Sequence, residues 1–415
     1  MMSARIASLC LTGAVLLILA MTHLSRYLVR DGSAEIGDHS EEISLRHATD
    51  SLEDCSDALS RDSCARVNGC SWCSSFSRGV QSMCVKTEQT ALYANKTLFE
   101  CDENSKSRKS NITQFYTGYH PQSLHNWEND PNGPMLYRGE YHLFLQYNPY
   151  GYEWGNMHWY HMKSKDLLHW EHLPIALSPD HKYDCDGIFS GSATIVNGKP
   201  VLTYSVSCGT VMVNAIPLNQ NDSSLKNWTK PNYNPAIVRP ETTAGFRDPT
   251  EGWKGDDGVW RMLTGCDDGA CMFKSTDFIN WTYNGIFWPT HVGFQECPDF
   301  YNLPGTDKNI YKGSAGGQDY WVLGEYKEST GIAEIDKFKN ISSDIKFDAR
   351  LYNRYDMGTF YASKTFYDTP NKRRVLFGYI SFHCAGADWS GIQSVPREIL
   401  LDPKKKKLNS DVSDS

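Results

Sequence analysis

His125–Pro134 reads HNWENDPNGP, and two other short acidic motifs follow it along the chain. They are FRDPTEGW at Phe246–Trp253 and FQECPDFYN at Phe294–Asn302. A single Asp-Pro pair is most often a turn former, so one such motif alone predicts only a turn. Three motifs that each place an acid where a strand meets a turn indicate a catalytic grouping. The three candidate carboxylates are Asp130, Asp248 and Glu296.

The surrounding residues, from about Gln114 to Asp402, alternate short apolar or aromatic runs with Gly, Asn, Asp and Pro turns, and they predict an all-β domain. The clearest strands are YHLFLQY, GSATIV, KPVLTYSV, VWRMLTG, DYWVLGEY and RRVLFGYI. Two similar strand ends, SKDLLHW at Ser164–Trp170 and STDFINW at Ser275–Trp281, favour a repeated β-propeller blade. Periodicity alone leaves a sandwich or a barrel open.

The three motifs resemble the invertase signatures WMNDPNG, RDP and EC of glycoside hydrolase family 32, in the family's order. The likeness covers almost all of Gln114–Asp402 and is greatest to plant-type acid invertases and related fructosyltransferases. It continues through QYNPYGYEWGNMHW, GIFSGSATI, RYDMGTFYASKTFYDTPNKRRVLFGY and WSGIQSVPREILLD. The resemblance implies a five-bladed β-propeller as the catalytic domain, over residues 111–402.

The family roles fit the chemistry of the side chains at the matching positions. Asp130 resembles the nucleophile that forms a covalent fructosyl intermediate, and Asn129 holds it in attacking geometry. Glu296 matches the general acid and base. Asp248 takes the position of the transition-state stabiliser, with Arg247 supplying a positive charge near the acid. The substrate pocket is then expected to be walled by Trp127, Gln146, Trp154, Phe189 and Ser190.

The cysteines and histidines add no cofactor to this expectation. In the family's EC motif, Cys297 is expected to pack beside the acid and tune its proton affinity. Two disulfides are expected in the propeller, Cys185 with Cys208 and Cys266 with Cys271, which leaves Cys384 unpaired. The histidines show no metal-ligand spacing, so we expect neither a metal nor a cofactor.

Two positions depart from the family pattern. Glu128 replaces the usual apolar residue before Asn129, and Gln295 replaces the usual Trp before Glu296. Because both lie beside catalytic neighbourhoods, we expect them to affect which acceptor, water or sugar, occupies the leaving-group side.

The N-terminal hundred residues indicate export. Residues 1–30 hold the apolar run Ile6–Leu24 and are expected to form either a cleaved signal peptide or an uncleaved signal anchor. An uncleaved anchor is the only contact with a membrane that we expect. Residues 31–50 form a polar linker. Residues 51–105 hold six cysteines, and the run CARVNGCSWC resembles PSI-type cysteine-rich modules. Together with six glycosylation sequons, these features predict the secretory pathway, with the protein secreted, in the cell wall, in the vacuole or lumen, or anchored as a type II membrane protein.

The C-terminal end differs from the family. Members normally continue into a β-sandwich domain, whereas residues 403–415 form a polar tail, so we expect no sandwich. Two explanations are open: a protein partner covers the face left exposed, or the gene model is incomplete.

Charge and motifs together narrow the function. A net charge of −8, without a continuous basic face, excludes a nucleic-acid partner. The hypothesis is retaining hydrolysis of terminal β-D-fructofuranosides, with sucrose or a fructan as the small carbohydrate partner. A fructosyltransferase or exo-fructanase that uses the same residues, and a catalytically silent sugar-binding protein, remain alternatives.

Overall fold

The computed structural model describes part of the chain, in two compact units that are treated separately. The described residues are 70–75, 83–86, 99–101, 116–206, 208, 210–219, 221–243, 245–267, 269–289, 295–341, 354–383, 387, 389–402 and 407–412. Every regular element in these ranges is a β-strand, which confirms the all-β prediction. No helix in them is long and apolar enough to cross a bilayer, and the predicted export segment lies outside them.

The smaller unit holds a three-stranded antiparallel sheet in the order β2-β1-β3. Its strands are β1 (Cys70–Ser75), β2 (Met83–Lys86) and β3 (Phe99–Cys101). The register places the backbone of Trp72 opposite Cys84 and that of Cys73 opposite Cys101. The predicted cysteine-rich segment therefore contains paired strands, while the rest of that segment lies outside the described residues.

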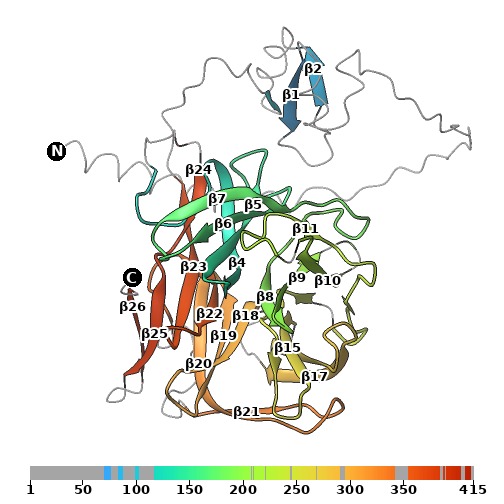
Figure 1. Cartoon of the computed structure of the whole chain (residues 1–415), viewed down its shortest axis with the longest axis vertical. Coiled ribbons are helices and arrows are strands. Elements are labelled where there is room, and N and C mark those ends of the chain that lie inside the picture. Colours follow the sequence, from blue (N-terminus) through green and yellow to red (C-terminus); the bar gives the residue numbers. More distant parts are fainter. Residues whose placement is uncertain are drawn as a thin grey trace, which may run out of the picture. The chain divides into compact units, whose positions relative to one another are not determined.

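The larger unit is a β-propeller whose sheets follow one another in chain order (Figure 1). One sheet holds β8 (Gly191–Val196), β9 (Lys199–Val206), β10 (Val211–Pro217), β11 (Trp228–Thr229) and β12 (Ile237–Val238). The next holds β13 (Phe246–Arg247), β14 (Trp253–Lys254), β15 (Trp260–Cys266), β16 (Gly269–Ser275) and β17 (Thr282–Pro289). A third holds β18 (Glu296–Asn302), β19 (Asn309–Ala315), β20 (Gln318–Lys327) and β21 (Lys337–Asn340).

A nine-stranded sheet joins the beginning of this unit to its end. Its early strands are β4 (Asn126–Tyr137), β5 (Glu140–Asn148), β6 (His158–Ser164) and β7 (Trp170–Leu177). Its late strands are β22 (Phe360–Asp368), β23 (Arg373–His383), β24 (Trp389–Gln393), β25 (Arg397–Asp402) and β26 (Lys407–Val412). Because β24 pairs in parallel with β4, the two ends of the unit close on each other.

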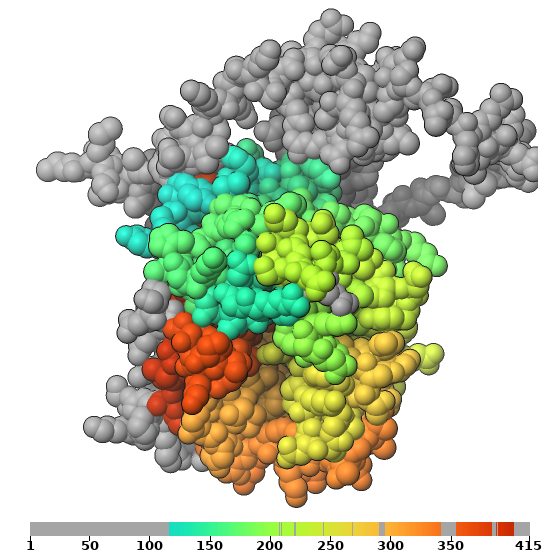
Figure 2. Space-filling model, viewed as in Figure 1, coloured from blue at the N-terminus to red at the C-terminus, as the bar shows by residue number. Residues whose placement is uncertain are grey.

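Five apolar clusters hold the strand groups together. The first packs β4–β6 against β8–β10, the second β9 and β10 against β15 and β16, and the third β15–β17 against β18 and β19. The fourth packs β18–β20 against β22, β23 and β25, and the last packs β22 and β23 back against β5 and β6. The clusters thus form a closed circuit, and in Figure 2 the surface colours follow the same succession from teal through green, yellow and orange to red. Burial of these side chains is the main stabilising contribution to the unit.

The two similar sequences at strand ends, Ser164–Trp170 and Ser275–Trp281, form the same turn. After β6, Ser164 Oγ accepts the Leu167 N–H at 2.8 Å, and after β16, Ser275 Oγ accepts the Phe278 N–H at 2.9 Å. The aspartate two residues after each serine accepts further backbone N–H groups. Such side-chain to backbone bonds close a tight turn, so the similar sequences mark equivalent corners of two sheets.

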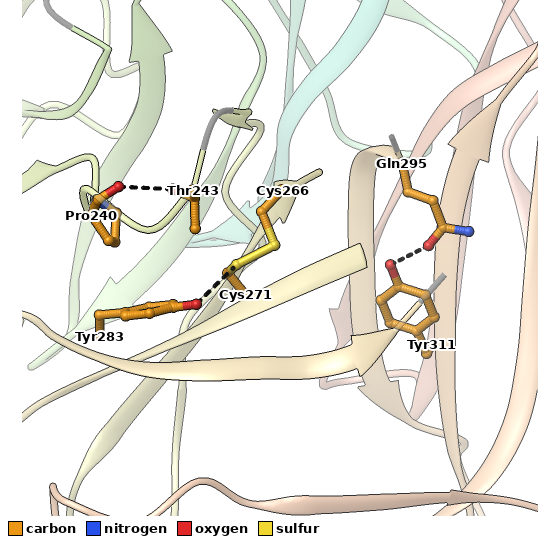
Figure 3. The surroundings of a disulfide bond; sticks show 7 residues. All are labelled: Pro240, Thr243, Cys266, Cys271, Tyr283, Gln295 and Tyr311. Carbon is orange, nitrogen blue, oxygen red and sulfur yellow. Dashed lines mark hydrogen bonds between the residues drawn. A yellow bond between two sulfur atoms is a disulfide. The ribbon is translucent and has the colours of Figure 1, made fainter. Parts of the chain in front are cut away.

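Both predicted propeller disulfides are present, Cys185 with Cys208 and Cys266 with Cys271. The second bridges the facing ends of β15 and β16, and Figure 3 shows the Tyr283 hydroxyl directed at Cys271 Sγ, 3.8 Å away. Cys297 is a free, buried cysteine, and Cys384 lies outside the described residues.

Candidate active site

The three acidic motifs meet at one pocket of about 620 Å³ in the larger unit. Asp130 lies in β4, Asp248 directly follows β13, and Glu296 begins β18, so three different sheets supply the carboxylates. The lining is completed by residues that adjoin them in sequence, by residues of β5, β9, β22 and β23, and by residues outside the strands, among them Trp154, Phe189 and Ser190. The lining residues are Trp127, Asn129, Asp130, Gln146, Trp154, Phe189, Ser190, Ser205, Val206, Thr210, Gly245, Phe246, Arg247, Asp248, Glu296, Tyr361 and Tyr379.

A break in the β4–β5 ladder presents Asp130 to the pocket. The register shifts between Glu128 and Pro131, and proline has no N–H to donate to the neighbouring strand. The Asp130 carboxylate accepts hydrogen bonds from Ser190 Oγ and, at 3.0 Å, from Asn129 Nδ2. Burial raises its pKa above the ordinary value, while these bonds oppose the shift.

A chain of hydrogen bonds orients the groups that hold Asp130. Trp127 Nε1 donates to Asn129 Oδ1 at 2.8 Å, and Asn129 Nδ2 also reaches Gln146 Oε1 at 2.7 Å. The Gln146 amide in turn donates to Ser190 Oγ at 2.8 Å. The carboxylate is therefore fixed by side chains that are themselves fixed, as preorganised catalysis requires.

Asp248 occupies an unusual backbone conformation. Its φ is 62°, and that of Cys297 is 45°, both in the left-handed region that costs free energy for residues other than glycine. The two residues are tied together because the Cys297 N–H donates to Asp248 Oδ2 at 3.0 Å. Burial, followed by the charge of Glu296, raises the pKa of Asp248 to about 6.

Glu296 is held from two sides. Arg247 Nη2 donates to its Oε1 at 2.7 Å, and the Tyr361 hydroxyl donates to its Oε2. Arg247 Nε also lies 3.8 Å from Asp248 Oδ2, so one guanidinium spans two of the three acids. With donors on both of its oxygens, Glu296 has a fixed orientation at the pocket.

Cys297 lies beneath the carboxylates. Its Sγ is 3.3 Å from Asp130 Oδ2 and 3.7 Å from Asp248 Oδ2. Burial, together with the charges of Asp248 and Asp130, raises the pKa of the thiol well above its ordinary value, so the sulfur keeps its proton and donates. The structure thus places the thiol against the two aspartates, while its residue directly follows the predicted acid Glu296 in the chain.

Comparison with known proteins assigns the family. Residues 120–411 match the description "Glycosyl hydrolases family 32 N-terminal domain". The chain belongs to glycosyl hydrolase family 32. An insoluble beta-fructofuranosidase isoenzyme of Arabidopsis thaliana is 38% identical over 352 residues, which cover 75% of this chain and 57% of the relative. A cell wall beta-fructofuranosidase isozyme of Pisum sativum is 40% identical over 337 residues, which cover 73% of this chain and 60% of the relative.

A solved structure has the same fold. The crystal structure of fructan 1-exohydrolase IIa from Cichorium intybus matches with a TM-score of 0.67 and 37% identity, covering 71% of this chain and 60% of that one. This chain therefore spans less than two thirds of the length of the relatives that it matches.

The pocket of this family 32 chain has the predicted aromatic walls. Trp154, 53% exposed, stacks on Phe189 with ring centroids 5.9 Å apart and an interplanar angle of 12°. The rings of Trp127 and Tyr379, which also line the pocket, have their centroids 6.4 Å apart. Flat aromatic faces beside carboxylates and amides suit the apolar and hydroxyl-bearing sides of a sugar. All ten predicted carboxylate and substrate-binding residues line the pocket: Trp127, Asn129, Asp130, Gln146, Trp154, Phe189, Ser190, Arg247, Asp248 and Glu296.

Sequence reasoning missed several pocket residues, of which Tyr361 and Ser205 matter most. Tyr361 donates to Glu296, and Ser205 Oγ accepts the Asp248 N–H at 3.2 Å. Ser205 belongs to β9, a strand that the apolar pattern located, and Tyr361 to β22, but alternation does not say which face of a strand meets the pocket. Tyr361 lies within the segment RYDMGTFYASK, and the resemblance of this segment to the family was the one sequence feature that could have indicated a role in the site.

The two departures from the family pattern point away from the pocket. The Glu128 carboxylate is fully buried and accepts hydrogen bonds from Ser123 N and, at 3.1 Å, from Gln393 Nε2. Burial raises its pKa to about 8. Gln295, which directly precedes β18, accepts at its Oε1 a hydrogen bond of 2.7 Å from the hydroxyl of Tyr311 in β19 (Figure 3). Neither side chain lines the described pocket, so the predicted effect on the acceptor, if present, would act through neighbouring residues.

Two groups elsewhere have metal-ligand residue types, but both are already engaged. In Asp180, His181 and Asp184, the Lys230 ammonium binds both carboxylates. In the other group, Cys185 and Cys208 form a disulfide beside Asp186.

Proposed function

We propose that this family 32 chain hydrolyses terminal β-D-fructofuranosides, with sucrose as the first substrate, through a covalent fructosyl intermediate and with net retention. The observation that carries the proposal is that Asp130, Asp248 and Glu296 open into one pocket between aromatic walls. Retaining glycoside hydrolysis needs an ionised carboxylate as nucleophile and a second carboxyl that protonates the leaving oxygen. Relatives with the names beta-fructofuranosidase and fructan exohydrolase support the choice of fructofuranosides.

Asp130 is assigned as the nucleophile. Three donors surround its carboxylate, from Ser190, Asn129 and Cys297, and hydrogen bonds to the charged form favour ionisation. These donors leave the carboxylate at the pocket surface, where it would attack the anomeric carbon of the fructosyl unit. Asn129 also fixes the direction of attack.

Glu296 is assigned as the general acid and base. It would protonate the glycosidic oxygen in the first step and remove a proton from the attacking water in the second. Arg247 and Tyr361 hold its two oxygens in place through both steps. The positive charge of Arg247 also favours the carboxylate that forms when the proton is given up.

Asp248 is assigned as the transition-state stabiliser. Its carboxylate is buried against Cys297 and Ser205, so a ligand hydroxyl would reach it only at the floor of the pocket. As the fructose ring flattens toward an oxocarbenium ion, hydrogen bonds to such hydroxyls strengthen. Cys297 contacts both aspartates through its thiol and would help to hold them in place.

The domain assignments are proposed on the same basis. We assign five blades over residues 111–402, because five apolar clusters link five strand groups and, within these residues, the nine-stranded sheet divides into β4–β7 and β22–β25. The paired strands at Cys70–Cys101 support a PSI-like module in residues 51–105. The remaining proposed parts are an export segment in residues 1–30, a linker in 31–50 and a tail in 403–415. The names of the relatives, insoluble and cell wall isoenzymes, support secretion to the cell wall.

Exo-hydrolysis of fructans is the second candidate, favoured by the likeness to a fructan exohydrolase. Incubating the glycosylated protein separately with sucrose and with 1-kestose, and separating the products, distinguishes the two. Equal glucose and fructose from sucrose support the first proposal, whereas fructose from 1-kestose alone supports the second. Glucose with a trisaccharide from sucrose would indicate transfer, and the absence of product from either sugar would contradict an enzymatic role.

A further inference from the structure

We propose that Lys364 is a positioning residue for the catalytic carboxylates, and that it acts through two backbone carbonyls below the pocket. The inference rests on the proposed function of the same site. Lys364 lies in β22 and is 1% exposed. Its ammonium donates to the carbonyl of Pro249 at 3.1 Å and to that of Pro298 at 3.0 Å.

These two carbonyls belong to the residues that directly follow Asp248 and Cys297. Both of those residues have positive φ, 62° and 45°, and such conformations persist only where surrounding contacts hold them. Lys364 is a contact that the two segments share, because a single ammonium bonds to the chain just after each strained residue. It thereby joins the segment that presents Asp248 to the segment that presents Glu296.

A second buried lysine, Lys312, adds hydrogen bonds to the Cys297 segment and to the strand of Lys364. Lys312 in β19 is fully buried, and its ammonium donates to the carbonyl of Cys297 at 2.9 Å and to that of Ser363 at 2.6 Å. Ser363 directly precedes Lys364, so the two lysines and the Cys297 segment form one connected network. Lys312 has a carboxylate partner, Asp319 Oδ2 at 3.3 Å.

Unlike Lys312, Lys364 has no carboxylate partner close to its ammonium in the described part of the chain. Among the described residues no carboxylate lies within 4.0 Å of its ammonium, and its hydrogen-bond partners are carbonyls. Burial lowers the pKa of the ammonium below its ordinary value, and the charge of Lys312 acts in the same direction. The charges of Cys297, Asp299 and Asp248 oppose this shift and favour the ammonium. Burying an ammonium without a close counter-ion is costly, so packing alone does not explain a lysine here. A positive charge behind the pocket favours the ionised form of Asp248 on the other side of the strained turn.

The chain contains a matched comparison. Lys274 in β16 is also fully buried, but its ammonium binds the Asp336 carboxylate at 2.6 Å and Ser329 Oγ at 2.8 Å, and neither partner lines the pocket. Replacing Lys274 therefore reports the general effect of removing a buried ammonium. Replacing Lys364 reports that effect together with any loss of positioning.

The test compares the full glycosylated chain as wild type, Lys364→Met, Lys364→Gln and Lys274→Met, with sucrose as substrate. For Lys364→Met we expect kcat to fall about 100-fold, the cost of a small displacement of reacting groups, with KM changed less than about fivefold. The acid limb of the pH profile should move to higher pH, because the cation no longer favours ionised Asp248. Lys364→Gln, which restores an N–H donor without the charge, should recover part of kcat and leave the limb displaced. Lys274→Met should lose thermal stability but keep kcat within about threefold.

Retention of normal kcat by Lys364→Met, or an equal loss in Lys274→Met, would overturn the inference. A crystal structure of Lys364→Met gives a readout independent of turnover. Movement of the Pro249 and Pro298 carbonyls with a change of φ at Asp248 supports positioning, and an unchanged backbone overturns it. Failure of the wild type on both sucrose and 1-kestose would refute the proposed function instead, and the crystallographic comparison would still decide the role of Lys364.

Discussion

Cys297 Sγ lies 3.3 Å from Asp130 Oδ2, close enough for the buried thiol to donate a hydrogen bond to the proposed nucleophile. The same sulfur lies 3.7 Å from Asp248 Oδ2, so it joins two carboxylates that come from different sheets. Removing the donor should destabilise the ionised form of Asp130 and leave both acids less well fixed.

Replacement of Cys297 tests this relationship. Cys297→Ala should lower kcat about ten- to a hundredfold, since a hydrogen bond to a charged group contributes about 1.5–3 kcal/mol. It should also move the acid limb of activity to higher pH, because a bond that lowers the pKa of Asp130 is lost. Cys297→Ser keeps a donor and should recover most of the activity. Steady-state kinetics on sucrose measure both, and equal losses in the two variants would show that the thiol serves packing alone.

The pH dependence of kcat/KM should show an acid limb above the ordinary aspartate range. Burial raises the pKa of Asp130, and burial with the charge of Glu296 raises that of Asp248 to about 6. Both groups act as carboxylates, so activity should be lost as pH falls through these raised values. A profile on sucrose from about pH 3 to about pH 9 measures the limb. A limb at or below the ordinary aspartate value of 3.8 would contradict the assignment of these environments.

Glu128 should make the protein less stable as pH rises. Its pKa is about 8 in the folded protein against an ordinary value of 4.5, so between these values the folded state holds a proton that the unfolded chain has released. Stability from this group is present below 4.5 and is lost as pH rises toward 8. Glu128→Gln should therefore raise Tm more at pH 8 than at pH 5, whereas the exposed Glu241→Gln should change neither. An equal effect of Glu128→Gln at both values would count against a buried, protonated Glu128.

Trp154 should contribute binding more than chemistry. It is 53% exposed and stacks on Phe189 at the pocket, where it can cover one face of a sugar. Trp154→Ala should raise KM about three- to tenfold, the usual range for an aromatic contact, with little change in kcat. Tyr119→Ala, at an exposed aromatic position that does not line the pocket, is the control. A similar change in KM for both variants would remove Trp154 from the binding surface.

The sequence predicted the strands and the catalytic carboxylates because both depend on local patterns. Alternating apolar residues located the strands that carry the core, and three short motifs located the acids. The family resemblance then supplied the propeller, which periodicity alone had not separated from a barrel or a sandwich. The parallel pairing of β24 with β4, which closes the larger unit, joins residues about 260 positions apart and leaves no local signal.

The supporting groups of the site were harder to predict. Tyr361 and Lys364 act through contacts with segments far away in the chain, and the apolar pattern of β22 does not distinguish their roles. Glu128 and Gln295 are each next to a pocket residue in the sequence, but neither side chain lines the pocket. In a strand, neighbouring residues face opposite sides, so the residue beside a pocket residue usually points away from the pocket.

Trapping the covalent intermediate on Asp130 tests the central claim most directly. In Glu296→Gln, β-D-fructofuranosyl fluoride should still react, because fluoride leaves without an acid, and the intermediate should accumulate because no base activates water. Peptide mass spectrometry is expected to find a fructosyl adduct on the peptide that contains Asp130, and none in the double variant with Asp130→Asn. An adduct on another residue, or turnover of the fluoride by the double variant at the rate of Glu296→Gln, would contradict Asp130 as the nucleophile.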